Sequence, residues 1–229
     1  MLVAQITDTH ITTPGTLLSD IIDTAAALER AVEALNRLDP LPDVTVVTGD
    51  LVDHGEPEEY AHLRAVLAPL RIVALDTLVS GETGGALCEE RLQWADHILT
   101  GAPDKPTLVL MHHPPFVTGI GRMDQFGFDG RDAFAEIVLR HPQIERIACG
   151  HLHRTIETRF AGTVVGTAPS TSHQLVLDLH PGAPPLHFAF EPSGYQLHSW
   201  SDGIGLVTHS VVIGDWPGPY SFSKKAPTN

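Results

Sequence analysis

Short apolar runs alternate with amphipathic stretches along the first two thirds of the chain. Runs of β-branched and other apolar residues predict strands, and apolar positions spaced three and four residues apart predict helices. The strands are predicted at residues 2–7, 44–48, 71–75, 107–111 and 144–148. The helices are predicted from an N-cap at Ser19 to a stop at Asp39 and Pro40, and at residues 57–67, 89–99 and 131–140. This alternation predicts the α/β class, with helices covering a sheet.

After residue 154 the pattern changes to short strands separated by turn residues, and no helix is predicted. The strands are expected at residues 155–160, 163–166, 175–179, 186–190, 195–200 and 206–213. A second sheet packed on the first is the simplest arrangement that buries their apolar faces. Residues 215–229 are rich in Pro, Gly and Ser, so we predict one domain over residues 1–214 followed by an extended C-terminal tail.

Composition narrows the range of partners. The chain of 229 residues carries 28 acidic and 14 basic side chains, and this net charge of −14 argues against binding to a nucleic acid polymer. The N-terminus does not resemble a signal peptide, the apolar runs are too short to span a bilayer, and Cys88 and Cys149 form no disulfide framework. We therefore expect a cytoplasmic protein with no membrane partner. An anionic substrate would need an attraction other than net charge, such as a bound metal ion.

Carboxylates and imidazoles follow four of the predicted strands. They stand in the motifs D-T-H, G-D-L-V-D, H-H-P-P and G-H-L-H, as Asp8 and His10, Asp50 and Asp53, His112 and His113, and His151 and His153. Because ligands of α/β sheets bind at the carboxyl ends of the strands, we expect these side chains to meet at one edge. Carboxylate and imidazole donors suit Mn, Fe or Zn, and the set contains no cysteine of the kind found in closed structural zinc sites. Two such ions would hold a phosphoryl group and supply a hydroxide, which predicts a hydrolase.

The order of these motifs, with the later stretch T-A-P-S-T-S-H-Q at residues 167–174, resembles the calcineurin-like metallophosphoesterase superfamily. Within it, the chain is most similar to the class III cyclic-nucleotide and glycerophosphodiester phosphodiesterases. The resemblance implies a four-layer αββα sandwich of two mixed sheets. It also implies roles for the motif residues: Asp8, His10 and His153 bind the first metal ion, His112 and His151 bind the second, Asp50 bridges both, and Asp53 orients a ligand or a loop.

One element of the family pattern is missing. The family carries G-N-H-[DE] between the second and third motifs, whereas here the helix at 57–67 runs almost directly into the strand at 71–75. The chain has two asparagines, Asn36 and Asn229, and neither follows a predicted strand. We therefore predict that an internal strand and helix segment is deleted and that the second metal ion is bound weakly. Asp76 is the nearest candidate replacement, although capping of a turn is its more ordinary role.

The deletion also removes the motif histidine, and loss of a general acid commonly lowers the rate about 10²–10⁴-fold. His113 is a candidate substitute for this acid, or alternatively a support for its loop. The other predicted catalytic residues are Asp50 and His112. His54, His173 and Arg122 are weaker candidates for substrate contact.

The predicted function is a metal-dependent phosphodiesterase that hydrolyses small phosphodiesters by attack of a metal-bound hydroxide. The alternative is a degenerate metal-binding or nucleotide-binding relative that serves in assembly. A deleted strand exposes a sheet edge, so we also expect a homo-oligomer.

Overall fold

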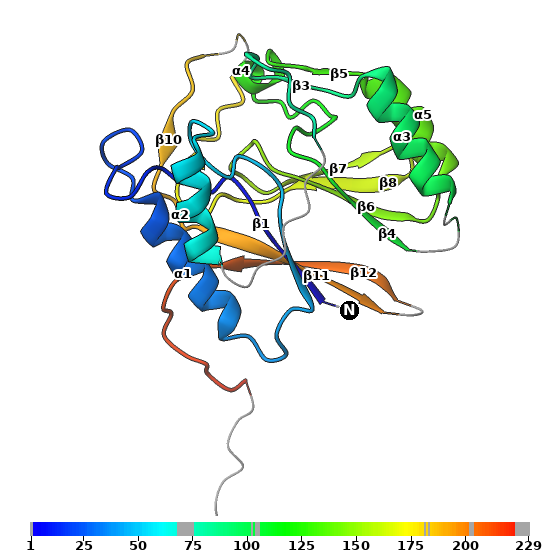
Figure 1. Ribbon diagram of the computed structural model, residues 1–229. Helices are drawn as coiled ribbons and strands as arrows, with labels where there is room; N and C mark the ends of the chain where they lie inside the picture. Colours follow the sequence, from blue (N-terminus) through cyan, green and yellow to red (C-terminus); the bar gives the residue numbers. More distant parts are fainter. Residues whose placement is uncertain are drawn as a thin grey trace, which may run out of the picture.

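Two four-stranded sheets lie face to face between two pairs of helices in the computed structural model (Figure 1). The structure describes residues 2–67, 76–101, 103, 106–180, 182, 184–201 and 204–222. The first sheet has the order β12-β11-β1-β2 and combines β1 (Leu2–Ile6), β2 (Val44–Val47), β11 (Gly194–Ser201) and β12 (Gly205–Val212). β1 pairs with β2 in parallel and with β11 antiparallel, so this sheet is mixed.

The second sheet is also mixed. It has the order β4-β6-β8-β7 and combines β4 (Thr107–Leu110), β6 (Ile144–Cys149), β7 (Ile156–Phe160) and β8 (Thr163–Thr167). β4, β6 and β8 run parallel, and β7 pairs with β8 antiparallel. The parallel strands of both sheets direct their carboxyl ends toward the loops that carry the predicted metal ligands.

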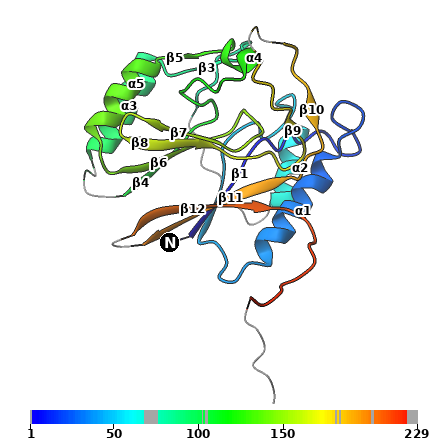
Figure 2. The same ribbon diagram turned by 180° about the vertical axis from the view of Figure 1, so that it is seen from behind.

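Helices cover the outer face of each sheet, as the view from behind confirms (Figure 2). On the first sheet, α1 (Thr24–Asn36) and α2 (Pro57–Leu67) share a core in which Leu28 and Leu63 pack with Ile6. On the second sheet, α3 (Glu89–Thr100) and α5 (Arg131–Arg140) form another core. A third cluster of Val3, Val46, Leu110 and Ala148 lies between the sheets. These three apolar layers confirm the four-layer αββα sandwich.

The shorter elements lie around the loops that carry the predicted metal ligands. They are β3 (Gly85–Ala86) paired with β5 (Phe128–Asp129), α4 (Gly121–Asp124), and β9 (Gln174–Leu175) paired with β10 (Phe188–Ala189). Among the described residues, no helix combines the length and apolar character needed to cross a bilayer.

The structure corrects two expectations. The late strands do not together form the second sheet, because β7 and β8 join β6, β11 and β12 join β1, and β9 pairs with β10. The first helix begins at Thr24 rather than after Ser19, since Ser19 and Asp20 adopt left-handed φ angles of 50° and 61°. The carboxylate of Asp23 caps the helix instead, accepting a hydrogen bond from Ala26 N at 2.9 Å. The strand expected at 71–75 lies outside the described residues, and the tail is described to residue 222 without a helix or strand.

Candidate metal centre

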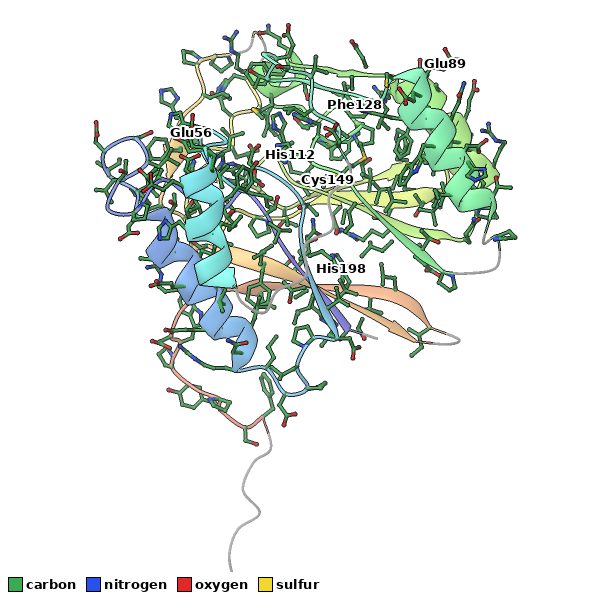
Figure 3. The ribbon with its side chains drawn as sticks, in the orientation of Figure 1. Glu56, Glu89, His112, Phe128, Cys149 and His198 are labelled. Carbon is green, nitrogen blue, oxygen red and sulfur yellow. The ribbon has the colours of Figure 1, made fainter. Side chains whose placement is uncertain are left out.

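Backbone hydrogen bonds join the motif loops in pairs. Asp8 N donates to Gly49 O at 3.1 Å and His10 N donates to Asp50 O at 2.8 Å, which ties together the loops after β1 and β2. Gly150 N donates to His112 O at 2.9 Å, which ties together the loops after β4 and β6. The motifs therefore meet at one end of the sandwich, where Figure 3 labels His112.

The backbone at the predicted metal ligands is strained. Non-glycine residues rarely adopt positive φ angles, and each such residue costs on the order of 1–3 kcal/mol. Five of the six predicted ligands adopt one: Asp8 (52°), His10 (43°), Asp50 (43°), His151 (70°) and His153 (46°). Strain of this kind persists where the surrounding structure holds side chains in a functional arrangement.

The first donor cluster contains Asp8, His10 and His153, whose ligand atoms lie within 4.8 Å of one another. His153 Nε2 lies 3.0 Å from Asp8 Oδ1 and 3.2 Å from His10 Nε2. Asp8 is fully buried, and within the described residues its Oδ2 atom has no hydrogen-bond partner. A buried carboxylate oxygen without a partner is costly, and a cation held among these donors would remove that cost. The donors therefore fit the divalent ion that the resemblance implies.

Asp50 lies between the two halves of the site. Its Oδ2 atom is 3.3 Å from His112 Nε2 and 3.8 Å from His10 Nε2. Asp8, Asp50 and His112 also form a candidate ligand group of their own. The Asp50 carboxylate therefore lies next to both His10 and His112, and its bridging role stays a prediction.

The second donor cluster contains three imidazoles. Ligand atoms of His112, His113 and His151 lie within 4.8 Å of one another, and the ring centroids are 4.6, 4.7 and 5.1 Å apart. His112 and His151 were expected here as ligands. His113 was predicted as a catalytic residue, and the structure places it beside both of them.

Charge and burial set the protonation of these groups. Burial alone would raise the pKa of the Asp8 carboxyl, but His153, His112 and His10 outweigh it and hold that pKa below its ordinary value. Burial and the neighbouring His112 lower the pKa of His113 to about 4, and the same two causes together with His113 lower the pKa of His151 to about 3. His113 and His151 are therefore neutral near pH 7, which is the form of imidazole that binds metal ions.

Glycines let the backbone approach the site closely. A Cβ atom on Gly49, whose φ angle is 133°, would lie 2.3 Å from His112 Nδ1. A Cβ atom on Gly150 would lie 2.2 Å from Thr7 Oγ1 and 2.9 Å from Asp8 Oδ2. Both positions therefore require glycine.

Three other sequence candidates have structural partners. Asp53 Oδ2 pairs with His54 Nδ1 at 3.0 Å. Asp76 Oδ1 accepts a hydrogen bond from Leu78 N at 2.8 Å, and its Oδ2 pairs with Arg91 at 2.6 Å, so Asp76 caps a turn.

Two candidates lie against rings at the border of the centre. His173 contacts His153 at 4.7 Å and Phe188 at 5.2 Å between ring centroids. Arg122 lies 5.8 Å above the Phe126 ring, whose centroid is 6.4 Å from that of His151.

The sequence analysis missed two supporting hydroxyls. Ser170 Oγ donates to Asp8 O at 3.2 Å, and Thr77 Oγ1 lies 2.8 Å from His113 Nδ1. Ser170 stands within the late motif stretch, which was a signal for it. Thr77 carries no local signal, because its relation to His113 arises from a contact between distant loops.

A cavity of about 220 Å³ opens beside the second donor cluster. Its wall includes His113 and His151 together with Thr118, Phe128 and Arg131. The cavity wall therefore combines imidazoles and apolar surface with one basic side chain, Arg131, and one acidic side chain, Asp124.

Comparison with known proteins agrees with this geometry. A family model described as calcineurin-like phosphoesterase matches residues 1–81. A probable glycerophosphodiester phosphodiesterase from Arcobacter nitrofigilis is 35% identical, over 97% of this chain and 97% of its own length. The chain belongs to the calcineurin-like metallophosphoesterase family. This membership confirms the expected enzyme class.

Two further similarities bear on this metallophosphoesterase. A probable cyclic nucleotide phosphodiesterase from Rhodopseudomonas palustris is 32% identical, over 90% of this chain and 96% of its own length. The solved structure of a dimetal phosphatase from Danio rerio matches with a TM-score of 0.58 at 11% identity, covering 93% of this chain and 99% of that one. The second likeness supports the metallophosphoesterase fold.

Proposed function

We propose that the protein is a metal-dependent phosphodiesterase that hydrolyses small phosphodiesters of the cyclic-nucleotide or glycerophosphodiester type. The observation that carries the proposal is the position of the Asp50 carboxylate, between His10 of the first donor cluster and His112 of the second. The names of the relatives supply the diester class. When bound, a pair of divalent ions supplies Lewis acidity toward phosphoryl oxygens and activates water.

The side chains of the four motifs are the proposed ligands of the two metal ions. Asp8, His10 and His153 would form the first ligand set, Asp50 would be shared by both ions, and His112 and His151 would belong to the second set. Two observations support this assignment: Asp8 Oδ2 has no hydrogen-bond partner among the residues described, and the ligand backbones are strained. Arg131 in the cavity wall supplies a positive charge for an anionic ester.

The expected leaving group follows from the missing G-N-H-[DE] segment. The family resemblance implies that the histidine of this segment contacts the substrate or protonates the leaving oxygen, and this chain lacks it. Protonation of an alkoxide leaving group should therefore be inefficient. We expect activated aryl diesters, whose departing oxygen needs little protonation, to be hydrolysed faster than alkyl diesters.

The test uses protein stripped of metal with a chelator and then titrated with Mn²⁺ or Zn²⁺. Hydrolysis of bis(p-nitrophenyl) phosphate should appear with metal, and His151→Ala should lower it by at least about 100-fold. The matched control is His209→Ala, which replaces an exposed histidine on β12. Turnover that needs no metal, or that survives in His151→Ala, would refute the proposal. Nucleotide binding without turnover would favour the alternative of a degenerate binding protein.

We also propose a homo-oligomer. In the part of the chain that the structure describes, β2 and β4 are edge strands of their sheets. Exposed edges are available for pairing with another subunit. The alignment with the relative from Arcobacter nitrofigilis spans 265 positions, more than the 229 residues of this chain. This difference supports the predicted internal deletion, and a deleted strand would leave a sheet edge exposed. Sedimentation at several protein concentrations should give a mass above 24.7 kDa, and a monomer would refute this proposal.

A further inference from the structure

We propose that His113 binds the second metal ion, so that the second site is formed by the imidazoles of His112, His113 and His151 together with the bridging Asp50. The inference rests on the metal requirement of the proposed function. It assigns a ligand role to a residue that the sequence pattern suggested only as an acid or a loop support.

The cluster geometry is the first argument. Each of the three histidines offers one ring nitrogen, and these nitrogens lie within 4.8 Å of one another. The ring of His113 is 4.6 Å from that of His112 and 4.7 Å from that of His151, measured between centroids. His112 is at the same time 3.3 Å from the bridging carboxylate of Asp50. His113 thus lies against both of the other imidazoles of the second site.

The orientation of the His113 ring is the second argument. Its Nδ1 atom lies 2.8 Å from Thr77 Oγ1, and the same hydroxyl is 3.4 Å from the His113 backbone nitrogen. A histidine that binds a metal ion through one nitrogen generally donates its other N–H to an oxygen, which orients the ring. Because Nδ1 is engaged by Thr77, the proposal assigns the metal ion to Nε2.

The backbone of β3 holds this ring in place. A Cβ atom on Gly85 would lie 2.4 Å from Cγ of His113, so the Gly85 backbone packs directly on the imidazole. Thr77 is 1% exposed and His113 is 5% exposed. A ring held on one face by Gly85 and at Nδ1 by a buried hydroxyl has little freedom to turn away from the cluster.

The donor types predict a difference between the two sites. The first site combines the carboxylates of Asp8 and Asp50 with two imidazoles, whereas the second would combine Asp50 with three. Carboxylate ligands suit Mn²⁺, and imidazole ligands suit Zn²⁺, Fe²⁺ and other late first-row ions. Three imidazoles with an open position is an established arrangement for catalytic zinc. The second site should therefore select Zn²⁺ over Mn²⁺ more strongly than the first site does.

Calorimetric titration of the metal-free protein with Zn²⁺ tests the inference. The wild type should bind two ions with distinguishable affinities. His113→Gln should raise the dissociation constant of one of them by at least about 10-fold and leave the other within a factor of about two. The matched control is His141→Gln, which replaces a buried histidine at the C-terminal end of α5, paired with Asp96 at 2.8 Å, and should leave both affinities unchanged.

A second measurement needs no variant. Long-range ¹H–¹⁵N spectra of the imidazoles should show the Nε2 resonance of His113 shifting when the second equivalent of Zn²⁺ is added, with Nδ1 keeping its proton. Unchanged Zn²⁺ affinities in His113→Gln, or an unshifted Nε2 resonance at two equivalents, would overturn the inference. Either result would leave the phosphodiesterase proposal standing, because that proposal is tested by turnover and by His151→Ala.

Discussion

The buried histidine His198 makes the stability of the fold depend on pH in a way that can be calculated. His198 lies on β11, away from His112 (Figure 3), and is 0% exposed. Its Nε2 atom lies 2.9 Å from Gln5 Oε1 and its Nδ1 atom 2.8 Å from Thr208 Oγ1. Gln5 Nε2 in turn donates to Cys149 O of the second sheet at 3.1 Å. His198 therefore belongs to a hydrogen-bond network that joins the two sheets.

Burial, with a smaller contribution from the positive charge of Arg146, lowers the pKa of His198 from 6.5 to about 3. Between these two values the unfolded chain binds a proton at this position and the folded chain does not. The free energy of unfolding therefore falls as the pH falls from 6.5 toward 3. At pH 5.0 the pH lies about 1.5 units below the unfolded pKa, which corresponds to a loss of about 2 kcal/mol relative to pH 7.5. A folded pKa one unit higher changes this loss little, because pH 5.0 would still lie above it.

The assay is urea unfolding of metal-free wild type and His198→Gln at pH 7.5 and 5.0, in the presence of a chelator. Glutamine cannot take up a proton, and every other titrating group is common to the two proteins. The stability of the wild type relative to the variant should therefore decrease by about 2 kcal/mol between the two pH values. Equal losses in the two proteins would show that His198 is protonated in the folded state, and the reasoning would be refuted.

Two substitutions test the roles of backbone and core. Gly49→Ala should abolish binding of the proposed metal pair, because its Cβ would lie 2.3 Å from His112 Nδ1. Gly55→Ala, where the Cβ meets open space, should keep the metal content measured by mass spectrometry. Normal metal content in Gly49→Ala would contradict the packing argument. Leu28→Ala should lower the free energy of unfolding by about 2–5 kcal/mol, since Leu28 is 0% exposed. Leu139→Ala, at a position 64% exposed, should change it little, and equal losses would count against the assigned core.

The sequence by itself located most helices and strands, since their signals are local. The helices expected at 57–67 and 131–140 are α2 (Pro57–Leu67) and α5 (Arg131–Arg140). The N-cap of the first helix, predicted at Ser19, was wrong. The left-handed backbone at Ser19 leaves Asp23 as the cap.

The grouping of the candidate donor residues was also predicted from the sequence. Each follows a strand, and the carboxyl ends of neighbouring parallel strands meet at one edge. The motifs thus predicted that Asp8, Asp50, His112 and His151 would come together, and the structure groups them in overlapping clusters.

Only the tertiary structure decided which strands share a sheet and which side chains complete each cluster. β11 pairs with β1 across almost the whole length of the chain, and β8 inserts between β6 and β7. Such pairings depend on the complementarity of distant faces, which no local pattern encodes. The same holds for His113: its contacts with His151 and Thr77 join three separate loops, so its place in the second cluster becomes visible only when the chain is folded.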